Sequence, residues 1–190
     1  MSEIKAGFAF CGSFCTLQQA VQQMESLVKR GVEIYPIMSA AAAETDTRFG
    51  TAQEWIERIE SAAGRPVIRT ITQAEPIGPQ RLLDILIIAP CTGNTLAKLA
   101  NGIADTPVTL AAKAHLRNER PVLLAVSTND ALAAAGQNIG ALLNRKQFYF
   151  VPMRQDAPQA KPRSVVADFS RLFDAMQAAL RGEQLQPLLL

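Results

Sequence analysis

The sequence predicts a single-domain α/β fold with three layers, in which helices cover both faces of a doubly wound, mostly parallel sheet. Segments with strand character alternate with segments of helical periodicity along the whole chain, the order typical of βαβ units. Two of the strand segments, Ile85–Ala89 and Pro121–Val126, are continuously apolar, as strands buried on both faces are. With 190 residues, 48% of them hydrophobic, the chain is long enough for one well-buried core. We assign residues 1–182 to this domain and residues 183–190 to a C-terminal tail.

The N-terminal segment predicts one βαβ unit. Ala6–Phe10 is a short apolar strand, and Leu17–Val28 keeps the spacing of an amphipathic helix. Gly31 stands where a glycine commonly ends a helix, and Val32–Met38 is the second strand. The crossover between the two strands is expected to be right-handed.

The next segment predicts a loop, a helix and a strand. Ser39–Gly50 has no clear period and is rich in small and hydroxyl residues, so we expect a loop over the functional site. Thr51 and Glu54 have the spacing of a capping box at the start of a helix that reaches about residue 63. Val67–Ile71 is a candidate third strand.

The central segment predicts a buried strand, a tight polar turn and a helix. Pro90 is expected to end the strand Ile85–Ala89, because proline has no N–H group for the ladder. Thr92 or Asn94 is able to cap the helix that follows, and Asn101–Gly102 closes it.

The C-terminal half continues the alternation. Thr106 and Pro107 predict the start of a helix that runs to about residue 116. The expected elements after it are the strand Pro121–Val126, a helix over 130–143, a strand over 148–151, a loop over 152–162 and a final helix over 164–180.

Composition excludes several classes of protein. The net charge of +2 gives no electrostatic case for a nucleic-acid or membrane partner. No apolar run approaches the roughly 20 residues of a membrane-spanning helix. Three cysteines without a secretion signal indicate a reducing compartment, and we expect the cytoplasm.

Three small polar turns follow three predicted buried strands, and they indicate a ligand site. They are Gly12-Ser13, Cys91–Thr95 and Ser127–Asn129. If the strands are parallel, all three turns meet at the carboxyl edge of the sheet, where open α/β sheets bind ligands. Helix capping alone explains any one of these turns, but three at one edge favour a site.

The turns favour a single phosphate over a dinucleotide. The first turn supplies only Gly12, so the G-x-G-x-x-G fingerprint of dinucleotide-binding folds is absent, and the chain contains no P-loop sequence. Hydroxyl groups without a lysine suit one phosphate group, such as that of a mononucleotide.

Cysteine and histidine do not predict a metal site or a catalytic triad. Cys11 and Cys15 are close in sequence, but Cys91 is remote and no histidine lies nearby, so we expect three buried thiols rather than zinc ligands. His115 is the only histidine and falls near a helix C-terminus, where the helix dipole stabilises a cation. We expect a structural or surface role for it.

Charged residues give weaker indications. Asp105 and Asp130 both fall at predicted helix starts, where capping is a sufficient explanation. Arg48 and Arg154 are candidates for holding carboxylates of an anionic ligand, since arginine binds carboxylates bidentately. As surface charge, these arginines need no special explanation.

At these turns the sequence resembles the flavoprotein family that includes the FMN-dependent cysteine decarboxylases. Its first motif, P-A-S/T-A-N-T, is matched by Pro90–Thr95, and its Gly-Ser turn is matched by Gly12-Ser13. Its second motif, P-x-M-N-x-x-M-W, is matched only in part, because Asn129 is present without the proline, the methionines and the tryptophan. The catalytic histidine of the family has no counterpart over residues 44–64. These departures argue against decarboxylation of a cysteine residue.

Other stretches resemble one subfamily, the B subunits of dipicolinate synthase from spore-forming bacteria. The resemblance spans nearly the whole chain and includes CGSFCT, TDTRFG, AEPIGP, AKAHLRN, AVSTNDAL, FVPMRQDAP and GEQLQP. It implies conversion of a dihydrodipicolinate or hydroxytetrahydrodipicolinate precursor to dipicolinic acid in the mother cell. It also implies that the partner is the NAD(P)-binding A subunit of dipicolinate synthase, and that the chain forms a homo-oligomer that is a trimer or a multiple of one.

The resemblance implies roles for the residues at the three turns. FMN or substrate would be held by six residues: Gly12, Ser13, Thr92, Asn94, Thr95 and Ser127. Asn129 and Asp130 would be catalytic, with Asp156 as another candidate proton acceptor, and Arg48 and Arg154 would bind the substrate. Two alternatives stay open: an independent FMN-dependent decarboxylase or oxidoreductase, and a non-catalytic protein that stabilises its partner.

Overall fold

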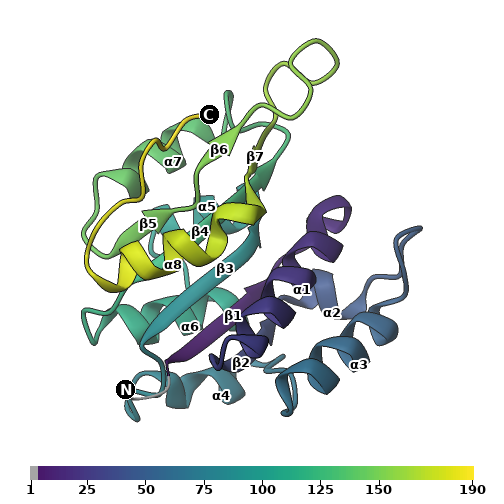
Figure 1. Cartoon of the computed structure of the whole chain (residues 1–190), viewed down its shortest axis with the longest axis vertical. Coiled ribbons are helices and arrows are strands. Elements are labelled where there is room, and N and C mark those ends of the chain that lie inside the picture. Colours follow the sequence, from purple (N-terminus) through teal and green to yellow (C-terminus); the bar gives the residue numbers. More distant parts are fainter. Residues whose placement is uncertain (1–3) are drawn as a thin grey trace.

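The sheet is seven-stranded over residues 4–190, which are the residues that the computed structural model describes. Its strands run in the order β2-β1-β3-β4-β7-β6, and β5 pairs with β4 beside β7 (Figure 1). The strands are β1 (Lys5–Phe10), β2 (Glu33–Met38), β3 (Ile85–Cys91), β4 (Val122–Thr128), β5 (Phe148–Phe150), β6 (Met153–Arg154) and β7 (Val165–Ala167). The predicted α/β class with a mostly parallel sheet is confirmed.

Parallel pairing brings the carboxyl ends of the first four strands to one edge. β1 pairs in parallel with β2 on one side and with β3 on the other, and β3 pairs in parallel with β4. Because the chain winds outward from β1 to β2 and then returns to β3, the winding direction reverses between β1 and β3. In open α/β sheets this reversal point opens a crevice at the carboxyl edge.

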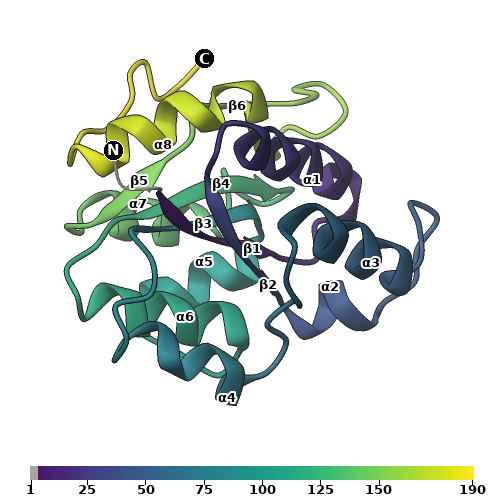
Figure 2. The ribbon, with the colours of Figure 1, turned by 60° about the horizontal axis from the view of Figure 1, so that its bottom comes forward.

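Helices cover both faces of the sheet (Figures 1 and 2). The helices are α1 (Phe14–Lys29), α2 (Ala40–Glu44), α3 (Ala52–Ala63), α4 (Ile71–Ala74), α5 (Gly93–Ala100), α6 (Pro107–Leu116), α7 (Gly136–Leu143) and α8 (Leu172–Leu180), with 3-10 turns at Glu75–Ile77 and Phe169–Arg171. One apolar core joins α1, α3 and α8 to the sheet, and a second core joins α4, α5, α6 and α7 to its other face. Alternate residues of β3 enter the two cores, Ile87 the first and Ile88 the second. Such alternation explains why the strand is apolar throughout.

The predicted helix starts at Thr51 and Thr106 are confirmed. The Thr51 hydroxyl accepts a hydrogen bond from the Glu54 N–H, and the Glu54 carboxylate accepts one from the Thr51 N–H. Thr106 and Thr109 form the same reciprocal pair at the start of α6. These caps satisfy backbone N–H groups that have no partner within the helix.

Two predictions about strands are wrong. Val67–Ile71 contributes only an isolated bridge between Ile68 and Ile37, and Ile71 begins α4, because Thr70 caps a helix there. Pro90 does not end β3, which continues to Cys91. The pairing register with β4 shifts between Ile88 and Cys91, and such an irregularity accommodates a residue without an N–H donor.

Three predictions about loops and helices are right only in part. The expected loop 39–50 begins with α2, whose first turn is capped by Ser39. The expected helix 130–143 forms only as α7, since residues 130–135 make hydrogen-bonded turns. The expected helix 164–180 begins with β7, which pairs antiparallel with the end of β4 and with β6. The β-branched pair Val165-Val166 is satisfied by these strand partners, and α8 starts only at Leu172.

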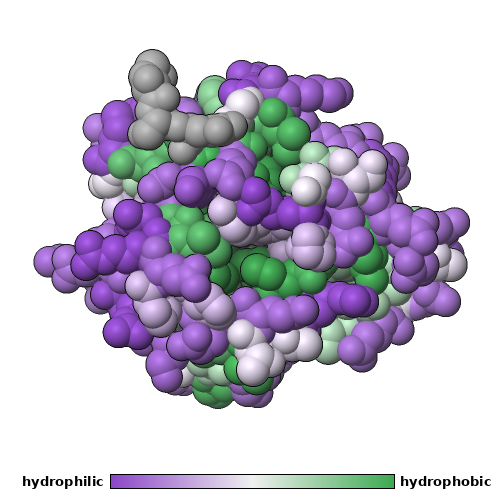
Figure 3. Space-filling view, turned by 90° about the horizontal axis from the view of Figure 1, so that it is seen from below, coloured by the Kyte–Doolittle hydropathy of each residue, from purple (hydrophilic) through white to green (hydrophobic). Residues whose placement is uncertain are grey.

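The last residues lie along β6. Met153 donates its N–H to Leu188 O, and its carbonyl accepts from Leu190 N, while Leu189 is 73% exposed. The end of the molecule seen from below in Figure 3 carries mostly hydrophilic side chains with apolar areas between them. Among the described residues, no helix combines the length and apolar character needed to cross a membrane.

Candidate functional site at the carboxyl edge of the sheet

A cavity of about 760 Å³ opens where the carboxyl ends of β1, β3 and β4 meet. The three predicted polar turns all contribute to its wall, as parallel pairing of their strands requires. A short loop before α3 and the loop between β6 and β7 complete the wall. The lining residues are Gly12, Ser13, Phe14, Cys15, Thr16, Phe49, Thr92, Gly93, Asn94, Ser127, Thr128, Asn129, Asp130, Asp156, Lys161, Ser164, Val165 and Val166.

Three hydroxyl groups join the first turn to the end of β4. The Ser13 and Ser127 oxygens lie 2.8 Å apart, and the Thr16 oxygen lies 3.0 Å from each of them. Each hydroxyl has one proton to donate, so this cluster uses much of its own donor capacity. The cluster therefore fixes the wall of the cavity more than it offers free donors to a ligand.

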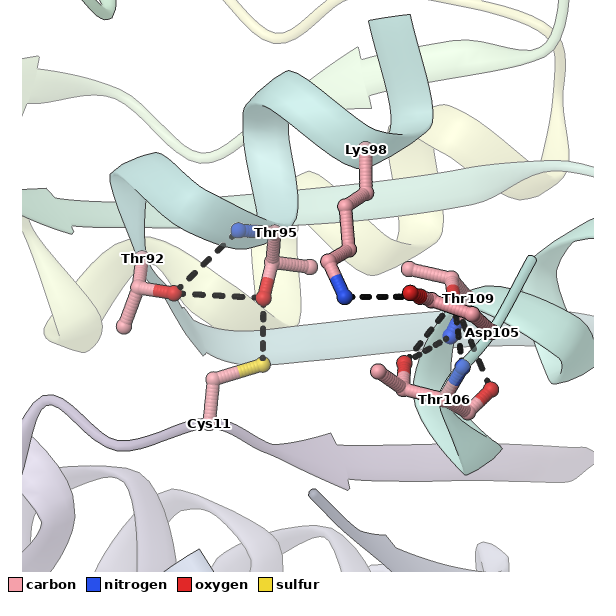
Figure 4. A network of polar contacts seen from close by, with 7 residues as sticks. All are labelled: Cys11, Thr92, Thr95, Lys98, Asp105, Thr106 and Thr109. Carbon is pink, nitrogen blue, oxygen red and sulfur yellow. Dashed lines mark hydrogen bonds and ion pairs between the residues drawn. The ribbon is translucent and has the colours of Figure 1, made fainter. Parts of the chain in front are cut away.

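Thr92 and Thr95 organise the start of α5 (Figure 4). The Thr92 hydroxyl accepts from the Thr95 N–H at 3.3 Å, so Thr92 is the cap and Asn94 is not. The Thr95 hydroxyl lies behind the wall and donates to Cys11 Sγ at 3.2 Å. Thr95 is thus the one predicted cofactor-binding residue that does not line the cavity.

Gly93 lets α5 approach the end of β4 closely. The Thr128 hydroxyl donates to Asp130 Oδ1 at 2.5 Å. A Cβ atom on Gly93 would lie 2.9 Å from both of these oxygens, so a side chain there would displace them. The hydrogen bond orients the Asp130 carboxylate, which lines the cavity beside Asn129 and does not cap a helix.

Asp156 and Lys161 come from the loop between β6 and β7. Lys161 Nζ lies 2.9 Å from Asp156 Oδ2. A hydrogen bond from Ser164 and the Lys161 ammonium hold the pKa of Asp156 below its ordinary value. The same contact raises the pKa of Lys161, so the pair is charged at neutral pH.

The two predicted substrate-binding arginines lie outside the cavity wall. Arg154 forms an ion pair with Asp168 at 3.6 Å. The Arg48 guanidinium stacks over the Phe49 ring, 4.9 Å from its centroid, and Phe49 itself lines the cavity. Arg48 thus sits behind a rim residue. Phe49 belongs to the loop expected over the site, but no signal in the sequence pointed to Lys161.

The cysteines differ from the expectation of three buried thiols. Cys11 and Cys91 are buried, and burial raises the pKa of Cys11 to about 11 and that of Cys91 well above its ordinary value. Both therefore stay protonated at neutral pH. Cys15 is exposed in the first turn of α1 and lines the cavity, so its predicted burial is wrong.

His115 lies away from this cavity in a structural position. Its side chain is 1% exposed, and its Nε2 lies 3.0 Å from Pro121 O. Nδ1 is buried without a hydrogen-bond partner. Burial, together with the positive charge of Arg120, lowers the pKa of His115 to about 4. The structural role is as predicted, but the expected stabilised cation at the helix end is wrong.

The cavity suits a planar ligand that carries an anionic group. Its volume lies within the usual range for cofactor sites. The first turns of α1 and α5 open onto it, and the N–H groups of a helix start attract anions. Asn94 and Asn129 add carboxamides, and Phe49 adds an aromatic face. The wall residues therefore fit FMN, which has a planar ring system and an anionic phosphate.

Comparison with known proteins gives one family. The model of the Flavoprotein family matches residues 1–168. The dipicolinate synthase B subunit of Bacillus subtilis (strain 168) is 45% identical over 192 aligned residues, which cover 100% of this chain and 96% of that protein.

Solved structures agree with this match. The crystal structure of the dipicolinate synthase B subunit from Bacillus halodurans C superposes with a TM-score of 0.90 at 44% identity, covering 98% of this chain and 96% of the other. The FMN-dependent cysteine decarboxylase SpaF superposes with a TM-score of 0.71 over 95% of this chain and 97% of its own. At 24% identity, the likeness to SpaF shows the shared fold alone.

Proposed function

We propose that this chain, which belongs to the Flavoprotein family and is similar over its full length to the dipicolinate synthase B subunits, works as the B subunit of a dipicolinate synthase. The observation that carries the proposal is the cavity at the carboxyl edge, in a chain similar over its full length to that protein. It would act with the NAD(P)-binding A subunit in the mother cell of a spore-forming bacterium. We further propose a homo-oligomer, a trimer or a multiple of one.

The proposed reaction is a two-electron oxidation that forms an aromatic ring. Dihydrodipicolinate loses a hydride and a proton to give dipicolinate, and the hydroxytetrahydro form first loses water. We propose that the hydride passes to the oxidised nicotinamide on the A subunit, which makes this chain part of an oxidoreductase. Aromatisation supplies driving force, so the protein has to position the precursor more than to activate it.

Asp130 and Asn129 are proposed as the catalytic residues. The hydroxyl of Thr128 holds Asp130 Oδ1, which leaves Oδ2 available to accept the ring proton. The carboxamide of Asn129 lies in the same wall and would orient the ring or one of its carboxylates. Arg48, at the rim behind Phe49, would attract the anionic precursor, and Arg154 would do so only after it leaves Asp168.

The wall residues also suit FMN, which we propose as a ligand of this chain. When bound, FMN would supply the two-electron acceptor in place of direct hydride transfer to the nicotinamide. Gly12 and Ser13 at the start of α1 would hold its phosphate, together with Thr92, Asn94 and Ser127 around the cavity. Thr95 would act indirectly, since it braces Thr92 from behind the wall.

A spectrum and a reconstitution test the proposal. The chain is mixed with FMN and desalted, and visible flavin bands that survive desalting support FMN binding. Its complex with the A subunit is then given precursor and oxidised nicotinamide, and dipicolinate is followed by the luminescence of its terbium complex. Formation of dipicolinate only when both proteins are present is the expected result.

A matched pair of variants separates a catalytic role from a stabilising one. Asn129→Ala should abolish dipicolinate formation while the complex still assembles. Asn144→Ala, an exposed asparagine at the end of α7, should leave the rate unchanged. Full activity of Asn129→Ala would contradict the proposed active site, and formation of dipicolinate by the A subunit alone would make this chain dispensable for the chemistry.

A further inference from the structure

Lys161 is the only cationic side chain in the cavity wall, as far as residues 4–190 are described. The other charged residues in the wall are Asp130 and Asp156, so the wall carries more negative than positive charge. A dicarboxylate precursor would be repelled by both aspartates. Lys161 is therefore the one wall residue whose charge favours such a ligand.

The loop that carries Lys161 is braced by its own hydrogen bonds. Lys161 N–H donates to Ala157 O at 2.7 Å, and Ser164 N–H donates to Lys161 O at 3.1 Å. Gln155 Nε2 donates to Pro162 O at 2.9 Å and closes the base of the loop. In Figure 1 this loop projects between β6 and β7 beyond the end of the sheet. The backbone at Lys161 is thus held in place at the mouth of the cavity.

In this structure the ammonium group of Lys161 is paired with the carboxylate of Asp156. The two charged atoms are 2.9 Å apart, yet the Lys161 side chain is 55% exposed. Ion pairs that are this open to water contribute little to stability.

Lys161 shares the wall of the cavity with the start of α1. Cys15 and Lys161 both line the cavity. A small turn of the lysine side chain away from Asp156 therefore directs its charge toward the space that a ligand would fill.

We propose that Lys161 is a specificity-determining residue that binds one carboxylate of the precursor in exchange for Asp156. This inference rests on the proposed function, since it assigns a binding partner to the dicarboxylate of that reaction. Asp156 acts as an internal competitor that keeps the lysine at the mouth of the cavity until a carboxylate arrives. Lys161 thus selects for ligands that have a carboxylate on the side of the ring facing it.

Direct binding measurements on the complex with the A subunit test the proposal. The probes are pyridine-2,6-dicarboxylate and pyridine-2-carboxylate, whose binding is measured by equilibrium dialysis and ultraviolet absorbance. Lys161→Met should weaken binding of the dicarboxylate about tenfold, the loss expected for one charge-assisted contact, and should reduce the preference for it over the monocarboxylate. Asp156→Asn should tighten binding of the dicarboxylate, because the competing charge is gone.

Arg163→Met is the matched control, because it removes the same charge from the same loop at an exposed residue outside the wall. Equal effects of Lys161→Met and Arg163→Met would overturn the proposal, as would weaker or unchanged binding in Asp156→Asn. In the catalysed reaction, Lys161→Met should raise KM with little change in kcat. If the unaltered complex binds the dicarboxylate through Lys161 but forms no product, the proposed function fails while this inference stands.

Discussion

We predict that protonation of the single histidine, His115, lowers the stability of the fold measurably in mild acid. His115 Nε2 faces the carbonyl of Pro121, so the proton of the neutral ring lies on Nε2. Protonation would place a second N–H at Nδ1, which is buried without a partner. This geometry agrees with a pKa lowered from 6.5 to about 4, mainly by burial.

The direction of this stability change follows from the pKa values of His115 in the unfolded and in the folded chain. The unfolded chain takes up the proton near pH 6.5, and the folded chain takes it up only near pH 4. The stability contributed by the neutral ring is therefore complete above about pH 6.5 and is lost as the pH falls toward 4. The loss amounts to roughly 2 kcal/mol at about pH 5 and approaches about 3 kcal/mol in stronger acid.

Urea unfolding measures this loss when it is compared with His115→Gln. Glutamine keeps a donor for the Pro121 carbonyl but does not titrate, and all other groups titrate alike in both proteins. Between about pH 7.5 and pH 5, the wild type should lose roughly 2 kcal/mol more than the variant. The ring resonances of the only histidine give its pKa directly by NMR. Parallel stability curves, or a pKa near 6.5, would refute the reasoning.

Three further predictions concern the helix caps and glycines. Thr106→Ala should cost about 1 kcal/mol in urea unfolding, since α6 loses its cap, and Thr106→Ser should restore most of it. Gly93→Val should abolish ligand binding in equilibrium dialysis, because its side chain displaces the oxygens of Thr128 and Asp130; unchanged affinity would show that this contact does not shape the cavity. Gly140→Ala should raise stability by roughly 0.5–1 kcal/mol, because its Cβ meets open space inside α7, and a decrease would contradict that packing.

Local patterns predict those elements that depend on one segment alone. Thr51 with Glu54, and Thr106 with Pro107, mark helix starts that the structure confirms, because a cap is formed by residues three or four positions apart. The predictions fail where a partner that is distant in the sequence determines which element forms. Val165-Val166 continues a helical pattern in the sequence, yet it becomes β7 because the ends of β4 and β6 offer hydrogen bonds.

The same distinction applies to the site. Parallel pairing alone brings Gly12, Thr92 and Ser127 to one cavity, so their meeting could be predicted from strand order. Phe49 and Lys161 stand in loops whose course depends on tertiary contacts. Phe49 lies in the stretch TDTRFG, whereas Lys161 belongs to no motif. His115 shows that the charge of a side chain is hard to predict from sequence. Its position near a helix end predicts a stabilised cation, but its burial keeps the ring neutral.

The arrangement of polar groups suits a protein that positions its ligand. The hydroxyls of Ser13, Thr16 and Ser127 are largely occupied with one another, and both thiols behind the wall are protonated. The groups left to meet a ligand are carboxamides, two carboxylates, one ammonium group, the hydroxyls of Thr92 and Ser164 and the thiol of Cys15. Such a set can orient a dicarboxylate and accept a proton, but it contains no group that takes up a hydride. An oxidation at this site therefore needs an electron acceptor from a bound cofactor or from a partner, and this requirement fits a reaction divided between two proteins.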